Sequence, residues 1–245
     1  MIKILSIGNS FSNNAHTYLH AIAESAGVEI KNANLYIGGC SLERHVSNIR
    51  TNAAAYGYYI NGASTGRRAT VMEGLLEEKW DFVTLQQASH FSGLYPTYYP
   101  YIYELSDYVK KYAPDARQII HQTWAYEKTA THPLFYRYNS NQQVMYAALV
   151  AAYNQAAKAI GADIIRCGEL VQALRRDPLF DIDNGGMQIT GDGYHMSKPY
   201  GCYAVGAAWF VKLCGGDIFK ANFVPEGADV YVINRIKNYV REIIG

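Results

Sequence analysis

Three residues of this chain have the types and the order that serine-based acyl transfer requires. Ser10 follows the apolar run Lys3–Ile7 and Gly8, at the turn where a strand should give way to a helix. Asp192 and His195 lie far down the chain, separated by two residues. A serine hydroxyl becomes a nucleophile when an imidazole takes its proton and a carboxylate orients that imidazole. The pattern therefore predicts Ser10 as a nucleophile, His195 as its base and Asp192 as the orienting acid.

Each half of this pattern also has an ordinary structural reading. A serine at a helix start caps free backbone N–H groups, and either Ser10 or Ser12 would do this well. An aspartate shortly before a histidine also arises by chance. The loop formed by residues 190–197 favours the catalytic reading, because it is polar and glycine-rich and directly precedes a helix that Pro199 would begin.

An acyl-transfer site also needs hydrogen-bond donors for the negative oxygen of its intermediate. Gly39, after the second predicted strand, offers an unobstructed backbone N–H, and the start of the first helix offers another. Gln86, Gln87, Ser89 and His90 follow the third predicted strand and offer side-chain donors. The glutamines have a structural alternative, a hydrogen bond to a neighbouring loop, because a buried amide must find partners.

Four residues in these loops are predicted to contact the substrate, namely Asn9, Gln86, His45 and Trp124. His45 has the alternative of a histidine satisfied on a helix face, and Trp124 the alternative of core packing. We expect no metal site and no cofactor. His16 and His20 have the helical spacing of a metal pair, but the glutamate of a zinc-binding helix is missing beside them. The four cysteines contain no Cys-x-x-Cys pair and are expected to be buried thiols.

Strand-like and helical segments alternate along the chain, which predicts a mostly parallel sheet of about five strands with helices on both faces. The predicted strands are Lys3–Ile7, Ile30–Ile37, Phe82–Leu85, Gln118–Thr123 and Asp163–Arg166. The predicted helices are Phe11–Ala26, Leu42–Tyr56, Arg68–Lys79, Tyr99–Tyr112, Gln142–Ile160, Glu169–Arg176, Pro199–Leu213 and Val230–Ile244. The polar loops that follow the first four strands should meet at one sheet edge, where such folds bind ligands.

The motifs together resemble the SGNH (GDSL-type) hydrolases over essentially the whole chain. Residues 8–12, Gly-Asn-Ser-Phe-Ser, are similar to the Gly-Asp-Ser block that opens those enzymes, and Asp192-x-x-His195 is similar to their closing block. Gly39 matches the glycine of their second block. The resemblance implies a three-layer α/β/α sandwich of the flavodoxin-like type. It also implies the roles given above for Ser10, His195 and Asp192, with the backbone N–H groups of Ser10 and Gly39 as oxyanion donors.

The chain departs from the family pattern at two places. Asn9 stands where the first block has an aspartate, a residue that orders the loop and does not react. The third block, which supplies an asparagine from a Gly-x-Asn-Asp loop, reads Leu-Gln-Gln-Ala-Ser-His here over residues 85–90. We expect a glutamine to replace that asparagine, with Gln87 as the third oxyanion donor. The amino-acid sequences of the remaining loops resemble a bacterial branch of this superfamily, whose members are often taken for carbohydrate esterases.

Bulk properties limit the class of protein. The 245 residues are 49% hydrophobic and 18% charged, which predicts one domain over residues 1–245 with a sizeable core. The net charge of +1 and the lack of basic runs favour neither nucleic acid nor an anionic membrane surface as a partner. No apolar run is long enough to cross a bilayer, and no secretion signal is visible. The sequence reads as cytoplasmic as it stands, or as secreted if a leader was removed.

Tyrosine is unusually abundant, with 22 residues gathered above all in residues 95–103 and 56–59. Its ring and hydroxyl suit half-wet clefts and sugar stacking, but equally the packing of a subunit interface. A lid over the site and a homo-oligomer interface are both left open. The leading hypothesis is an esterase that removes small acyl groups, acetyl above all, from a sugar or similar ester. The alternatives are a non-catalytic carbohydrate-binding or phosphate-binding domain on the same fold.

Overall fold

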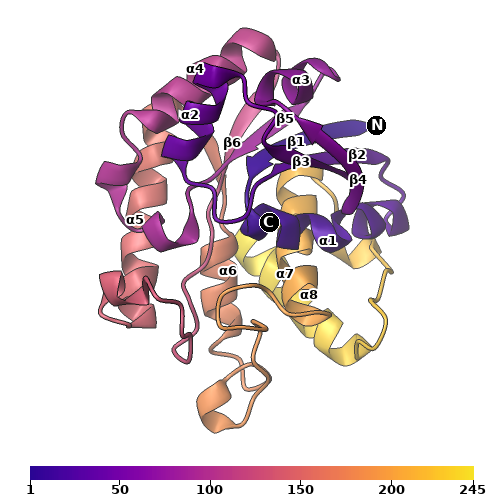
Figure 1. Cartoon of the computed structure of the whole chain (residues 1–245). Helices are drawn as coiled ribbons and strands as arrows, with labels where there is room; N and C mark the ends of the chain where they lie inside the picture. Colours follow the sequence, from indigo (N-terminus) through magenta and orange to yellow (C-terminus); the bar gives the residue numbers. More distant parts are fainter.

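A seven-stranded sheet forms the centre of the protein in a computed structural model that describes all 245 residues (Figure 1). The strand order is β4-β3-β2-β1-β5-β6-β7. The strands are β1 (Ile2–Gly8), β2 (Ile30–Tyr36), β3 (Tyr56–Ile60), β4 (Ala63–Ala69), β5 (Phe82–Leu85), β6 (Arg117–His121) and β7 (Asp163–Ile165). The predicted α/β class with its mostly parallel sheet is confirmed, and the sheet is two strands wider than expected.

Five of the strands form the parallel sheet that the sequence pattern predicted. They are β2, β1, β5, β6 and β7, and each pairs in parallel with its neighbour. Counted along the chain, their spatial order is 2-1-3-4-5, which is the flavodoxin-like order. The chain leaves β1 toward β2 and later returns to the other side of β1 as β5. This reversal of direction at β1 opens a crevice at the carboxyl end of that strand.

The two additional strands form a hairpin at one edge of the sheet. β3 pairs antiparallel with both β2 and β4, and two residues, Asn61 and Gly62, connect the hairpin strands. Their φ angles of 50° and 82° are both positive, as a tight type I′ turn requires. The predicted helices Leu42–Tyr56 and Arg68–Lys79 were therefore wrong where they overlap this hairpin. The Asn-Gly pair was a readable hairpin signal, but most of β4 is solvent-exposed and polar, so alternation was absent.

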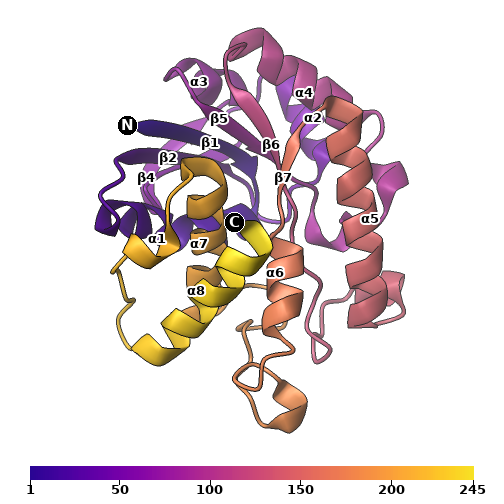
Figure 2. The same ribbon diagram turned by 180° about the vertical axis from the view of Figure 1, so that it is seen from behind.

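Helices cover both faces of the sheet (Figures 1 and 2). On one face α1 packs against α7, and α7 and α6 pack against α8. On the other face α4 packs against α2, α3 and α5. The helices are α1 (Ser10–Ser25), α2 (Leu42–Thr51), α3 (Val71–Leu76), α4 (Tyr101–Tyr112), α5 (Gln142–Ile160), α6 (Cys167–Leu174), α7 (Tyr200–Cys214) and α8 (Val230–Ile244). The three layers match the predicted sandwich.

The core lies between the sheet and both helical layers. The side chains of Ile4, Leu5 and Ile7 on β1 are fully buried, as expected for a central parallel strand that has helices on both faces. Most residues of α7 are buried, and Gly206 lets this helix approach α1 closely. None of the helices has both the length and the apolarity to span a membrane. This rigid centre carries the loops of the candidate site on the carboxyl ends of its strands.

Candidate active site

The structure brings Ser10, His195 and Asp192 together in one hydrogen-bonded chain. Ser10 is the first residue of α1, directly after β1. Its Oγ lies 2.8 Å from Nε2 of His195, and the Nδ1 of the same ring lies 2.7 Å from Oδ2 of Asp192. These contacts have the geometry in which a base can take the serine proton while an acid holds the base.

A tight turn makes the Asp192–His195 contact local. Oδ1 of Asp192 accepts hydrogen bonds from the backbone N–H groups of Tyr194 and His195, at 3.1 and 2.7 Å. Gly193 has a φ of 90°, a conformation that glycine adopts without strain. Burial alone would raise the pKa of the Asp192 carboxyl. The hydrogen bonds from His195 and Tyr194 outweigh that effect and hold this pKa below its usual value, so the carboxylate stays charged.

The loop that carries Asp192 and His195 is anchored to the body of the protein from two sides. It belongs to the long connection between α6 and α7, which extends to the bottom of Figure 2. The N–H of Met196 donates to Oδ1 of Asn14 on α1 at 3.0 Å. The indole N–H of Trp124, after β6, donates to the carbonyl of Tyr194 at 2.7 Å. The anchors hold the imidazole over the start of α1, within hydrogen-bond distance of Ser10.

Asn9 orders the loop that carries Ser10 and does not line the cavity described below. Its side chain caps α1, because Oδ1 accepts from the N–H of Phe11 at 3.0 Å. The same oxygen accepts from the amide of Gln86, and Nδ2 donates to the carbonyl of Cys40 at 3.1 Å. Asn9 is buried, so its prediction as a substrate contact is corrected. Its contacts tie the Ser10 loop to the chain just after Gly39.

A cavity of about 270 Å³ lies over the triad. Its walls come from the loops after β1, β2, β5 and β6 and from the loop that carries His195, as the sheet-edge argument predicted. The lining residues are Ser10, Phe11, Tyr36, Gly38, Gly39, Ser89, His90, His132, Tyr194 and His195. Ser10 and Gly39, the two predicted backbone donors, therefore share one cavity with His195, the predicted base.

Neither glutamine after β5 lines this cavity, so the predicted substrate contact of Gln86 and the predicted oxyanion donation by Gln87 are both corrected. Oε1 of Gln87 accepts from the N–H of Leu42 at 3.0 Å, and its amide nitrogen donates to the carbonyl and the hydroxyl of Thr97. Gln86 donates to Asn9, and its Oε1 lies 2.7 Å from Nδ1 of His121. Both amides are buried and use their polar atoms on neighbouring loops, which is the structural alternative named above.

Ser89 and His90, the other two side chains considered after β5, do reach the cavity. The hydroxyl of Ser89 lies 2.8 Å from that of Tyr126. Burial, with a contribution from His132, lowers the pKa of His90 to about 4, so its ring is neutral at pH 7. Ser89 therefore lines the same cavity as Ser10 and Gly39, and it carries a hydroxyl group that can donate a hydrogen bond.

Sequence reasoning missed His132, which also lines the cavity. Its Nδ1 accepts a hydrogen bond from the N–H of Leu134 at 3.1 Å, so the neutral ring carries its proton on Nε2. Burial and the nearby His195 lower the pKa of His132 and favour that neutral form. The only available signal was its place in the loop after β6. From that loop, Trp124 was the only residue predicted to contact the substrate.

His45 and Trp124 are core residues, and their predicted contacts with substrate are corrected. His45 is fully buried, with Nδ1 2.8 Å from the hydroxyl of Tyr56. Burial, aided by the charge of Arg44, lowers the pKa of His45 to about 3. Trp124 is also fully buried and stacks on Phe11 with ring centroids 4.4 Å apart. Trp124 supports the floor of the site from below, because Phe11 lines the cavity.

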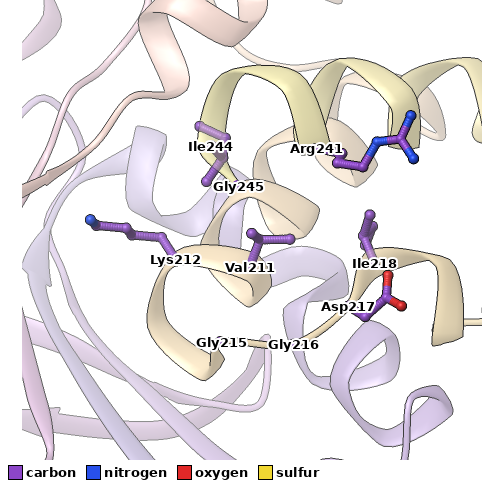
Figure 3. A pocket seen from close by; sticks show the side chains of 9 residues that line it. All are labelled: Val211, Lys212, Gly215, Gly216, Asp217, Ile218, Arg241, Ile244 and Gly245. Carbon is purple, nitrogen blue, oxygen red and sulfur yellow. The ribbon is translucent and has the colours of Figure 1, made fainter.

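A larger hollow of about 420 Å³ lies elsewhere, between the carboxyl ends of α7 and α8 (Figure 3). It is lined by no serine, histidine or cysteine. Its charged side chains do not converge, since Lys212 and Arg241 extend in opposite directions in Figure 3. The smaller cavity over Ser10 is therefore the better candidate for an active site, because it joins a nucleophile, a base and donors.

Comparisons with known proteins agree with this fold. The model of the family described as "Domain of unknown function (DUF4886)" matches residues 3–241. A crystal structure of a DUF4886 family protein from Bacteroides uniformis is 37% identical, with a TM-score of 0.93, over 99% of this chain and 94% of that one. A search of curated proteins found no match.

Structures of hydrolases share the fold at lower identity. A candidate SGNH hydrolase from Slackia heliotrinireducens is 25% identical, with a TM-score of 0.59, over 84% of this chain and 96% of that one. Axe2, an acetylxylan esterase from Geobacillus stearothermophilus, is 12% identical, with a TM-score of 0.52, over 91% of this chain and 95% of that one. The resemblance to the SGNH superfamily that the sequence motifs predicted is thereby confirmed, and the neighbours support a hydrolase.

Proposed function

The chain belongs to the DUF4886 family, and from that premise we propose that it is a serine esterase of the SGNH type that removes small acyl groups from saccharide esters. The observation that carries the proposal is the Ser10–His195–Asp192 chain of hydrogen bonds beneath an open cavity. A non-catalytic binding domain would have no use for a base held at hydrogen-bond distance from a serine at a helix start.

The first half of the reaction forms an acyl-enzyme. Ser10 Oγ attacks the ester carbonyl carbon while Nε2 of His195 takes the hydroxyl proton. Asp192 holds the other ring nitrogen and stabilises the imidazolium that forms. The C–O bond to the alcohol then breaks, and His195 returns its proton to the departing alcohol oxygen. The acyl group remains bound to Ser10 as an ester.

The second half releases the acid. A water molecule gives a proton to His195 and attacks the acyl carbon, and collapse of the intermediate returns that proton to Ser10 Oγ. The negative oxygen of both intermediates needs donors already in position. The backbone N–H groups of Ser10 and Gly39 supply two of them. We assign the third to the hydroxyl of Ser89, since Gln87 uses its amide elsewhere.

The cavity supports a short acyl group. At about 270 Å³ it lies below the range of volumes typical of pockets for drug-sized ligands, and the rings of Phe11 and Tyr36 belong to its lining. The hydroxyls and imidazoles of the remaining lining suit a polar alcohol such as a sugar. The acetylxylan esterase among the structural neighbours adds fold-level support for acetyl esters of carbohydrate.

Hydrolysis of p-nitrophenyl acetate beside longer p-nitrophenyl esters tests this proposal. We expect activity that falls with chain length and that Ser10→Ala and His195→Ala lower by at least about a thousandfold. Ser47→Ala is the matched control, because Ser47 is exposed on α2 and does not line the cavity. Covalent labelling by a fluorophosphonate should be lost in Ser10→Ala, weakened in His195→Ala, which lacks the base, and kept in Ser47→Ala. Undiminished turnover by Ser10→Ala would refute the assignment.

A further inference from the structure

A second cavity of about 260 Å³ opens beside the candidate active site. It contains much of the tyrosine-rich segment that the sequence singled out and that the triad does not use. Its lining residues are Ser41, Glu43, Gln87, Phe91, Pro96, Thr97, Tyr99 and Tyr101.

The two cavities are lined by neighbouring residues along two stretches of chain. In the loop after β2, Gly39 lines the first cavity and Ser41 lines the second. In the loop after β5, His90 lines the first and Phe91 the second, with ring centroids 4.3 Å apart. The second cavity is therefore the neighbouring hollow that a ligand larger than one ester group over Ser10 would meet first along these loops.

The lining combines aromatic rings with polar groups. Phe91, Tyr99 and Tyr101 supply the rings. Tyr99 is 68% exposed to solvent. Ser41 accepts a hydrogen bond from the backbone N–H of Arg44, which leaves its hydroxyl proton available to a ligand. A pyranose has an apolar face of C–H groups and a rim of hydroxyls, and this mixture of rings and polar groups matches both.

The frame of the second cavity is held in place without a ligand. Gln87 bonds the start of α2 at Leu42 on one side and Thr97 on the other. The hydroxyl of Tyr101 donates to Glu43 Oε1 at 3.1 Å and links the same two sides of the cavity. Because these bonds already exist, a ligand would not have to order the walls, which favours affinity.

We propose that the second cavity binds a neutral sugar residue adjacent to the acylated one, so that the substrate is an acylated oligosaccharide. The inference rests on the proposed function, since the first cavity must hold the ester. The carboxylate of Glu43 repels a uronic acid in this position. It also opposes an aliphatic acyl chain, whose methylene groups would have to lie against that carboxylate and the hydroxyl of Ser41.

Kinetics on matched esters test the inference. Wild-type protein is compared with Tyr99→Ala on p-nitrophenyl acetate, monoacetylated xylose and monoacetylated xylobiose. We expect wild-type protein to prefer xylobiose to xylose about tenfold in kcat/KM, and Tyr99→Ala to lose that preference. The control is Tyr231→Ala on α8, because Tyr231 is 67% exposed, nearly the same as Tyr99, and lines neither cavity. It should keep the preference.

The outcomes separate the two proposals. If hydrolysis of p-nitrophenyl acetate depends on Ser10 but Tyr99→Ala leaves the xylobiose preference intact, the sugar subsite is refuted and the esterase proposal stands. The same holds if wild-type protein shows no preference, or if Tyr99→Ala selectively impairs long-chain p-nitrophenyl esters. An acetylated disaccharide of galacturonate that is cleaved as well as the neutral one also refutes a neutral subsite. Absence of any Ser10-dependent hydrolysis refutes both proposals.

Discussion

Ser89 illustrates how much a single position depends on its neighbours. It follows Gln86 and Gln87 in the chain, and all three residue types carry hydrogen-bond donors. The glutamines turn into the protein, where their amides bond backbone and side-chain groups of adjacent loops. Ser89 instead lines the cavity with Ser10. The sequence showed that side chains with hydrogen-bond donors follow β5. Which of these side chains points into the cavity was decided by packing.

Replacing Ser89 by alanine should lower kcat for p-nitrophenyl acetate by about a hundredfold or more, with little change in KM. The reason is that an oxyanion donor acts mainly in the transition state. Tyr126→Phe is the matched control, because it removes the hydroxyl 2.8 Å from Ser89 Oγ while leaving Ser89 in place. It should cost far less. If both variants lose kcat equally, Ser89 only supports the loop and the third donor is another group.

At the scale of elements, the β3–β4 hairpin widens the sheet beyond the five parallel strands. Its turn lies against α1, since a Cβ built on Gly62 would come within 2.9 Å of the backbone carbonyl oxygen of His16. Only a residue without a side chain fits there. The hairpin is therefore packed on the helix that begins with Ser10, although it contributes no residue to the cavity over Ser10.

Gly62→Ala should lower the free energy of unfolding by roughly 2–3 kcal/mol, as a sum of backbone strain and steric overlap with α1. Gly66→Ala isolates the strain, because Gly66 also has a positive φ, of 74°, but open space around its Cβ position. We expect about 1 kcal/mol there. Urea denaturation of both variants measures the difference. Equal losses would mean that the turn does not press on α1.

The whole molecule buries three histidines, His16, His45 and His121, that are outside the candidate site. Burial is the main cause that lowers the pKa of each to about 3. His16 on α1 bonds Ser6 of β1 at 2.7 Å, and His121 of β6 bonds Gln86, just after β5, at 2.7 Å. The neutral rings therefore cross-link the centre of the fold. Protonating any of them would place a charge in the core, which unfolding would relieve.

We therefore expect stability to fall as the pH drops below 6.5. Each buried histidine binds a proton in the unfolded chain at pH values where it stays neutral in the folded one. The contribution of each histidine to the free energy of unfolding is complete above pH 6.5. It decreases as the pH falls toward the folded pKa of about 3. These three groups alone contribute a slope of up to about 4 kcal/mol per pH unit, and the lowered pKa of His90 acts in the same direction.

Urea unfolding between pH 7.5 and 5 measures this slope directly. His45→Phe should reduce the slope by about 1.4 kcal/mol per pH unit, because one titrating group is removed, whatever its effect on the stability at pH 7.5. A free energy of unfolding that does not change between pH 6.5 and 5 would show that these histidines are not held neutral in the folded protein.

The sequence by itself determined the parts of this protein that depend on local periodicity and short motifs. Apolar runs and helical spacing predicted the five parallel strands and the sandwich, because burial on both faces imposes a pattern on each strand. The order of Ser10, Gly39, Asp192 and His195 predicted a family whose fold the comparisons confirm. The roles of these four residues remain predictions, although the structure gathers all but Asp192 around one cavity and bonds Asp192 to His195.

Only the tertiary structure decided which polar residue faces the cavity and which faces the core. Asn9, Trp124 and both glutamines lie in the right loops, and His45 lies on the helix after one of them. The side chains of all five are nevertheless buried against other segments. His132 comes to the cavity from a long loop without a periodic signal. The physical reason is that a loop residue's direction depends on which distant donors and acceptors must be satisfied, and those partners are brought near only by folding.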